Sequence, residues 1–238
     1  MLRLGRAVLI GAIVLPACSR IAPDPLPGFP SLMLWAWERP EDLRFLDPLS
    51  AGVAFLDATI TIDRGHASLK PRLQPLRVAS GTKLMAVVRV ESRGPAANPE
   101  YVAALLTAGM RSGISGLQID YDAPVSERAF YRNLARIVRA RLPRDVPLTM
   151  TALVSWCASD DWIRDFPVAD AVPMYFRMGA EPYLRRAALN NPLCQASTGL
   201  STDELIRVPL HRRLFLFNPR PWTREALRLA MSEVNRWQ

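Results

Sequence analysis

The sequence predicts an α/β protein, specifically a compact (β/α)8 barrel of the TIM type. From residue 32 onward, short apolar runs alternate with amphipathic helical patterns, which is typical of parallel strands joined by crossover helices. Some runs, such as residues 84–88, are apolar at every position, as expected of strands buried on both faces. The alternative is a doubly wound open sheet. Its nucleotide-binding version is disfavoured because no glycine-rich phosphate loop follows any strand.

Eight strands are predicted, the seventh of them short or irregular. They are residues 32–37, 53–62, 83–91, 115–122, 147–154, 169–176, 195–200 and 213–217. Helices are predicted at 99–111 after the N-cap Asn98, at 126–142 before Pro143, and at 223–237. Eight such units fit a single domain over residues 32–238, at the lower end of the size range of this fold.

Composition excludes several classes of protein and of site. Half of the residues are apolar and 22% are charged, which excludes disordered and multi-span membrane proteins. The net charge of +8 comes from scattered arginines, and nucleic-acid binders instead concentrate such charge in a stripe, so no nucleic-acid partner is expected. With only two histidines and three cysteines, no zinc site of these ligands is expected, and we predict no metal and no cofactor. A metal site built from carboxylates is the alternative.

The N-terminus predicts export. Residues 1–17 read as a signal peptide, with Arg3 and Arg6 ahead of the apolar run 7–15. Leu15-Pro16-Ala17-Cys18 resembles a bacterial lipoprotein lipobox, which implies cleavage before Cys18 and lipidation of that residue. We therefore expect a periplasmic protein anchored to the outer membrane through the lipid, with residues 18–31 as an extended tether. A buried first helix is the alternative, and the prolines that follow argue against it.

Two cysteines remain after Cys18. In an oxidising periplasm Cys157 and Cys194 are expected to form a disulfide. Two separate buried thiols are the alternative.

Chemistry in a parallel barrel collects where strands end. Along the fourth strand Gln118, Asp120 and Asp122 alternate with apolar residues and so share one face. Two carboxylates on one face repel, which raises the pKa of one of them and favours a proton donor. Asp120 and Asp122, with Glu91 as a partner, are the candidate catalytic residues. A structural pair neutralised by Arg89 or Arg177 is the alternative.

Aromatic and polar residues at the same strand ends suggest a carbohydrate partner. Four of the six tryptophans, Trp35, Trp37, Trp156 and Trp222, lie at or near strand ends, and flat aromatic faces beside polar groups suit a sugar ring. The candidate substrate-binding residues are Trp35, Trp37, Glu38, Arg89, Gln118, Trp156, Tyr175, Arg177, Asn218 and Arg220.

Four motifs carry a family resemblance. Residues 116–122, 151–157, 172–179 and 216–222 together resemble an uncharacterised bacterial family known as domain of unknown function 3142. The matching pieces run from about residue 32 to residue 222. The grouping of that family with glycoside-hydrolase-like barrels implies the fold but no reaction.

A more distant resemblance concerns the fourth strand. Asp120-x-Asp122 is similar to part of the family-18 chitinase signature Asp-x-x-Asp-x-Asp-x-Glu, but Leu117 replaces the first aspartate and Pro124 replaces the proton-donating glutamate. A hydrolase would therefore need another acid, with Asp122, Glu91 and Glu38 as candidates.

Three functional hypotheses follow from the sequence. The first is a glycoside hydrolase that acts on an envelope or extracellular polysaccharide. The second is a non-catalytic carbohydrate-binding or envelope-assembly lipoprotein on a degenerate barrel. The third places the basic surface against anionic lipid or another protein.

Overall fold

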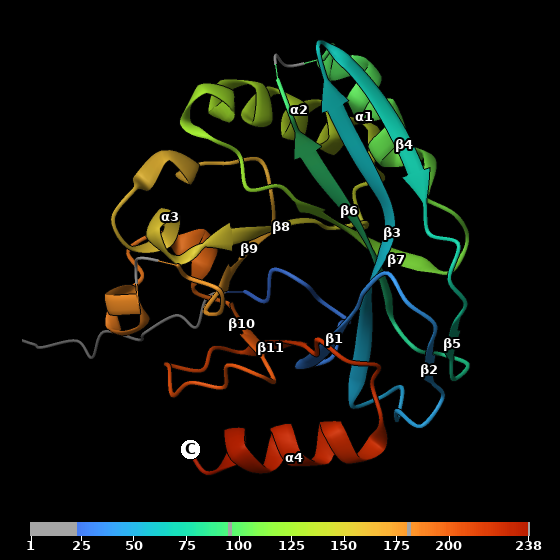
Figure 1. The fold of residues 1–238 in the computed structure, drawn as a ribbon, viewed down its shortest axis with the longest axis vertical. Helices are drawn as coiled ribbons and strands as arrows, with labels where there is room; N and C mark the ends of the chain where they lie inside the picture. Colours follow the sequence, from blue (N-terminus) through green and yellow to red (C-terminus); the bar gives the residue numbers. More distant parts are fainter. Residues whose placement is uncertain (1–22, 95–96, 180–181, 238) are drawn as a thin grey trace, which may run out of the picture.

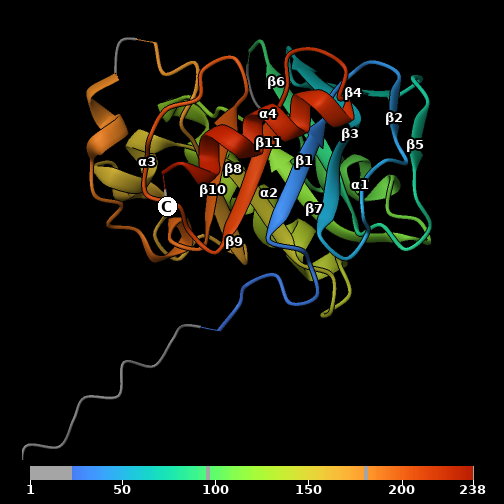
Figure 2. The same cartoon turned by 90° about the horizontal axis from the view of Figure 1, so that it is seen from below.

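The barrel is closed. The computed structural model describes residues 23–94, 97–179 and 182–237, so the predicted signal peptide and Cys18 lie outside the described residues. The eight barrel strands are parallel, and β1 pairs with both β3 and β11, which closes the ring and confirms the predicted fold (Figures 1 and 2). In chain order they are β1 (Leu32–Ala36), β3 (Ala51–Asp63), β6 (Leu84–Ser92), β7 (Ile114–Asp120), β8 (Leu148–Leu153), β9 (Asp170–Met174), β10 (Ser197–Ser201) and β11 (Arg213–Phe217).

The predicted long helices are present, with small differences at their ends. They are α1 (Pro99–Ala108), α2 (Arg128–Arg141) and α4 (Arg224–Asn235). Asn98 caps α1 by accepting hydrogen bonds from two backbone amides of the first turn. Ser126 lies not in α2 but in the preceding 3-10 turn η1 (Val125–Glu127).

Four shorter helical elements lie on the side of β8 to β10. They are α3 (Val154–Ala158) and the 3-10 turns η2 (Asp161–Ile163), η3 (Pro182–Arg186) and η4 (Pro192–Cys194). The predicted disulfide between Cys157 and Cys194 is confirmed and joins α3 to η4. Within the described ranges, no helix has the length and apolar character needed to traverse a bilayer.

The first two crossovers contain strands where a regular barrel has helices. β2 (Glu41–Leu43) follows β1, and β4 (His66–Pro71) and β5 (Leu76–Val78) follow β3. β4 returns antiparallel to β3 through a two-residue turn at Arg64 and Gly65, both with positive φ, a geometry that suits a tight hairpin. β2 and β5 pair with each other, and this pairing of two three-residue segments has no local signature in the sequence.

β10, the seventh barrel strand, is short and weakly paired to one neighbour. Its register with β9 consists of the single pair Gly199 and Met174, whereas five pairs join it to β11. A side chain at Gly199 would collide with the ring of Trp35, so this strand is locally adapted to the large indole inside the barrel. The predicted irregularity is therefore confirmed.

The N-terminal segment belongs to the barrel. Leu26 is fully buried and Phe29 nearly so, and both pack with the inner-face residues Met33 and Met85. Arg213, at the start of β11, donates hydrogen bonds to the backbone oxygens of Leu26, Phe29 and Pro30. The prediction that the fold begins at residue 32 therefore differs from the structure: the segment 24–30 closes the end of the barrel where the strands begin.

Candidate functional site

A cavity of about 390 Å³ opens at the ends of the barrel strands. It contains the three predicted catalytic carboxylates, Asp120, Asp122 and Glu91. Of the predicted binding residues, it also contains Trp35, Trp37, Arg89 and Arg177. Inner-face positions of β1, β6, β7 and β8 converge here because alternate side chains of each strand point into the ring. The site thus combines acidic, basic and aromatic groups in one recess.

Asp120 is the most perturbed acid of the cavity. It ends β7, and the hydroxyl of Thr151 on the neighbouring strand β8 donates a hydrogen bond to its Oδ1 at 2.7 Å. Burial raises the pKa of Asp120 to about 6; the Thr151 hydrogen bond lowers it, the negative charge of Asp122 raises it further, and Arg89 lowers it. A carboxylic acid with such a pKa can hold and release a proton near neutral pH.

Asp122 and Glu91 flank Asp120 in different settings. Desolvation raises the pKa of Asp122 and Arg89 opposes this, but the residue is exposed, so Asp120 is the stronger candidate for a proton donor. Glu91, on β6, forms ion pairs with Arg89 at 3.3 Å and with Arg93 at 3.6 Å. Its carboxylate therefore sits between two guanidinium groups.

Aromatic rings form another wall. Phe176 and Phe217 stack with their centroids 5.9 Å apart, and Trp37 meets the Phe217 ring edge-on at 6.0 Å. The guanidinium of Arg177 lies over the same Phe217 ring, 5.5 Å from its centroid. Phe176 and Phe217 were not among the predicted binding residues. Their spacing of two from Met174 and Phe215 on the inner face is the signal that places them in the cavity.

Gln118 lies fully buried inside the barrel and not in the cavity lining. Its Oε1 accepts a hydrogen bond from Nε1 of Trp35 at 2.8 Å. Gln118 therefore orients an aromatic ring of the cavity, and the structure gives it no contact with the open space.

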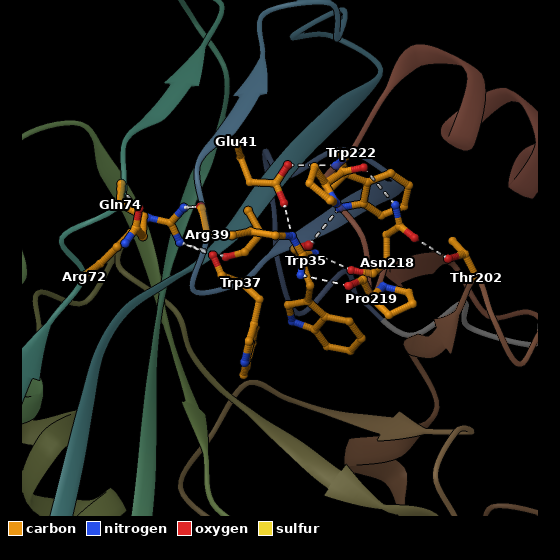
Figure 3. A network of polar contacts seen from close by, with 12 residues as sticks. Trp35, Trp37, Arg39, Glu41, Arg72, Gln74, Thr202, Asn218, Pro219 and Trp222 are labelled. Atoms are coloured by element: carbon orange, nitrogen blue, oxygen red, sulfur yellow. Dashed lines mark hydrogen bonds and ion pairs between the residues drawn. The ribbon is translucent and has the colours of Figure 1, made fainter.

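A network of hydrogen bonds among Arg39, Glu41 and Trp222 fixes the end of β1 (Figure 3). Glu41 accepts hydrogen bonds from Arg39 Nε and from the backbone amide of Trp222, both at 2.8 Å. The Trp222 indole in turn donates to the backbone oxygen of Trp35 at 2.9 Å. The ring of Trp37 points away from this network (Figure 3), which leaves it free to line the cavity.

Several predicted binding residues lie outside the cavity lining. Asn218 is buried and bonded to Thr202 and to the Pro221 carbonyl, so it belongs to the same network. Glu38 forms an ion pair with Lys70 at 2.8 Å, and Arg220 is exposed beside the network. For these three positions the structure differs from the prediction, because Asn218 and Glu38 are engaged by partners outside the cavity lining and Arg220 lies at the exposed surface.

Trp156 and Tyr175 are also absent from the cavity lining, for different reasons. Trp156 is buried in α3 and its ring meets that of Trp162 at 4.9 Å; the predicted strand 147–154 ends one residue earlier, at Leu153, and a helix follows it. Tyr175 is buried in the hydrophobic core outside the barrel interior. It follows Met174, whose side chain faces the cavity, and successive residues of a strand point to opposite faces. Two of the four strand-end tryptophans, Trp35 and Trp37, therefore reach the cavity.

Glu127 lies next to the cavity and was not singled out by the sequence. It accepts a hydrogen bond from Ser92 Oγ at 2.7 Å and another from the hydroxyl of Tyr121, and both donors line the cavity. This carboxylate links the ends of β6 and β7. Its position three residues after Pro124 is a weak signal, since helix N-termini commonly carry acidic residues.

No group of three His, Cys, Asp or Glu side chains suited to a metal ion occurs within the described ranges. Comparison of the chain with family models, with curated proteins and with solved structures finds no match in any of the three. The resemblance to domain of unknown function 3142 therefore stays a prediction, and the interpretation of the site depends on its own geometry.

Proposed function

We propose that this protein is an exported glycoside hydrolase that acts on an envelope or extracellular polysaccharide. The observation that carries the proposal is Asp120, a half-buried acid with a pKa of about 6 in a cavity lined by Trp35 and Trp37. Glycoside hydrolysis needs an acid that is protonated near neutral pH and a second carboxylate beside it. Aromatic walls provide the surface for the sugar ring.

In this proposal Asp120 donates its proton to the glycosidic oxygen as the bond to the anomeric carbon breaks. Water adds to that carbon and gives its proton to a second carboxylate, for which Glu91 and Asp122 are the candidates. Thr151 holds one oxygen of Asp120 and so fixes the direction of the other. Each turnover consumes one water and restores Asp120 by proton exchange with solvent.

The N-terminal sequence and the disulfide both support action outside the cytoplasm. The signal-like residues 1–17 and the lipobox-like sequence before Cys18 support export and a lipid anchor in the outer membrane. The disulfide between Cys157 and Cys194 supports an oxidising compartment.

The test measures release of reducing ends from a panel of bacterial polysaccharides. Asp120→Asn is expected to lower kcat/KM by about 100-fold or more, since general acid catalysis contributes about 10²- to 10⁴-fold. In the wild type, kcat/KM should fall as the pH rises above about 6, because Asp120 must be protonated to act. Asp145→Asn, an exposed acid outside the cavity, is the control. Equal activity of Asp120→Asn and wild type would remove Asp120 from the mechanism.

One observation favours a second function, non-catalytic carbohydrate binding. Glu91 is ion-paired with both Arg89 and Arg93, so both of its carboxylate oxygens already have a cationic partner within the protein. Saturable binding of a glycan that Trp37→Ala weakens, with no release of reducing ends at any pH, would support this second function.

A further inference from the structure

We propose that the cavity takes an acidic polysaccharide and that Arg177 binds the carboxylate of a uronic acid unit. The inference rests on the proposed function, and it adds the chemical class of the glycan. Arg177 lies at the edge of the cavity, where contacts to Glu204 and Phe217 hold its backbone and its side chain.

The backbone of Arg177 has a conformation that non-glycine residues rarely adopt. Its φ is 52°, in the left-handed region, and such strain persists where surrounding contacts impose it. In one of these contacts, the amide of Arg177 donates a hydrogen bond to Oε2 of Glu204 at 3.0 Å. The strained backbone sets the direction in which the side chain leaves the loop after β9.

The side chain is ordered by the aromatic wall. Its guanidinium lies over Phe217, which is stacked on Phe176. Stacking covers one face of the guanidinium and leaves its N–H edges available. Arg177 therefore presents a planar array of donors whose orientation is set before a ligand arrives.

Among the residues that the structure describes, the Arg177 guanidinium has no acidic partner. Arg89, the other arginine of the cavity lining, pairs with Glu91, whereas no acidic side chain in the described part of the chain comes within ion-pair distance of the Arg177 guanidinium. A planar carboxylate is the group that matches a guanidinium fork with two parallel hydrogen bonds. The site thus has one arginine whose charge is compensated and one that awaits an anion.

The position of Arg177 suits a substituent on a bound sugar. Arg177 follows β9, whereas Asp120 ends β7 and Arg89 lies on β6, with β8 between β7 and β9. A sugar ring packed against Trp37 would bring a ring substituent toward Arg177, whose guanidinium covers the neighbouring Phe217 ring. A uronic acid carries such a carboxylate on the ring itself.

The experiment measures binding of three uronate oligosaccharides, from polygalacturonate, alginate and hyaluronan, by calorimetry with the full-length protein. Each is paired with the same oligosaccharide after its carboxylates are reduced to alcohols. The wild type is expected to bind at least one native oligosaccharide about 10- to 100-fold more tightly than its reduced form, as loss of a charge-assisted hydrogen-bonded pair implies. Arg177→Gln should remove this preference, and Arg177→Lys, which keeps the charge but lacks the fork, should retain only part of it.

The control is Arg220→Gln, which removes the same charge from an exposed position outside the cavity lining. It is needed because a chain of net charge +8 attracts any polyanion without a specific site. A preference that Arg220→Gln and Arg177→Gln reduce equally, or no preference for any of the three native oligosaccharides, would overturn the inference. A preference for dextran sulfate that depends on Arg177 would overturn the assignment to a carboxylate. Thermal unfolding of both Arg177 variants shows that the comparison is made on folded protein.

Failure of this inference and failure of the proposed function give different results. Hydrolysis of neutral glycans alone, abolished by Asp120→Asn, would keep the hydrolase and reject the acidic substrate. Binding of a native uronate that depends on Arg177, with no hydrolysis, would keep the acidic ligand and reject the reaction.

Discussion

Asp120 and Asp170 are both inner-face acids whose pKa is raised to about 6 by burial, but they lie at opposite ends of the barrel. Asp120 lines the open cavity. Asp170 begins β9, is fully buried, and accepts a hydrogen bond from Ser197 Oγ at 2.6 Å. The same physical effect therefore has different consequences: at Asp120 the bound proton can reach a ligand, whereas at Asp170 it can affect only stability.

Asp170 predicts a pH dependence of stability. Because its pKa is higher in the folded than in the unfolded chain, the folded state binds more protons between about pH 4 and pH 6, and the free energy of unfolding falls as the pH rises through this range. The free energy of unfolding of Asp170→Asn minus that of the wild type should therefore be larger at pH 7 than at pH 4, by up to about 3 kcal/mol.

Urea denaturation at several pH values measures this difference. Arg213 lowers the pKa of Asp170 and Asp24 raises it. The pH range over which stability falls is therefore taken from a plot of the wild-type free energy of unfolding against pH. The exposed Asp145→Asn serves as the control. A difference between Asp170→Asn and wild type that stays constant from pH 4 to pH 7 would contradict the prediction.

At the level of elements, the short helical segments around β9 depend on a covalent link. α3 and η4 have five and three residues, too few for a helix to be stable alone. The disulfide between Cys157 and Cys194 joins them across 37 positions of the chain. Phe176 and Arg177 follow β9, within the stretch of chain that the disulfide closes, so the bond also restrains one wall of the cavity.

The double variant Cys157→Ser with Cys194→Ser is expected to lose about 2 to 4 kcal/mol of stability. The loss follows from the entropy that the crosslink removes from the unfolded chain, for a loop of this length. Denaturation of the wild type with and without a reducing agent should show the same difference, and the reducing agent should leave the double variant unchanged. A double variant as stable as the oxidised wild type would contradict this account.

At the level of the whole molecule, the barrel is closed at one end and open at the other. The segment 24–30 fills the end where the strands begin, with Leu26 fully buried and Arg213 bound to its carbonyl groups. The cavity with Asp120 occupies the other end. The described chain therefore begins at the end of the barrel opposite the cavity.

Leu26→Ala is expected to destabilise the protein by about 2 to 5 kcal/mol, the cost of a large buried aliphatic side chain. A tether outside the fold would show no such effect. Leu49→Ala is the matched control, since Leu49 is 91% exposed and should change the free energy of unfolding by less than about 0.5 kcal/mol. Equal stability of the two variants would show that the segment does not support the barrel in solution.

The sequence by itself determined the strands of the barrel and the central acids. Several strands were runs of apolar residues, a local pattern typical of burial on both faces, and the period of two placed Gln118, Asp120 and Asp122 on one face before any contact was known. These features depend on neighbours in the chain, so local patterns predicted them. The disulfide was predicted from the number of cysteines and the expected oxidising compartment.

Only the tertiary structure decided which strand-end residues meet. Trp156 and Tyr175 are as aromatic and as close to a strand end as Trp37, yet both are buried in the main hydrophobic core outside the barrel interior. Trp156 is there because it lies in the helix that starts at Val154. Tyr175 is there because it follows Met174 by one residue, and alternate residues of a strand face opposite sides. Leu26 looked like part of a proline-rich tether because its partners, the inner faces of the strands, come from distant parts of the chain. Burial and side-chain pairing depend on contacts between residues that are far apart in the sequence, and only the closed ring of strands brings those residues together.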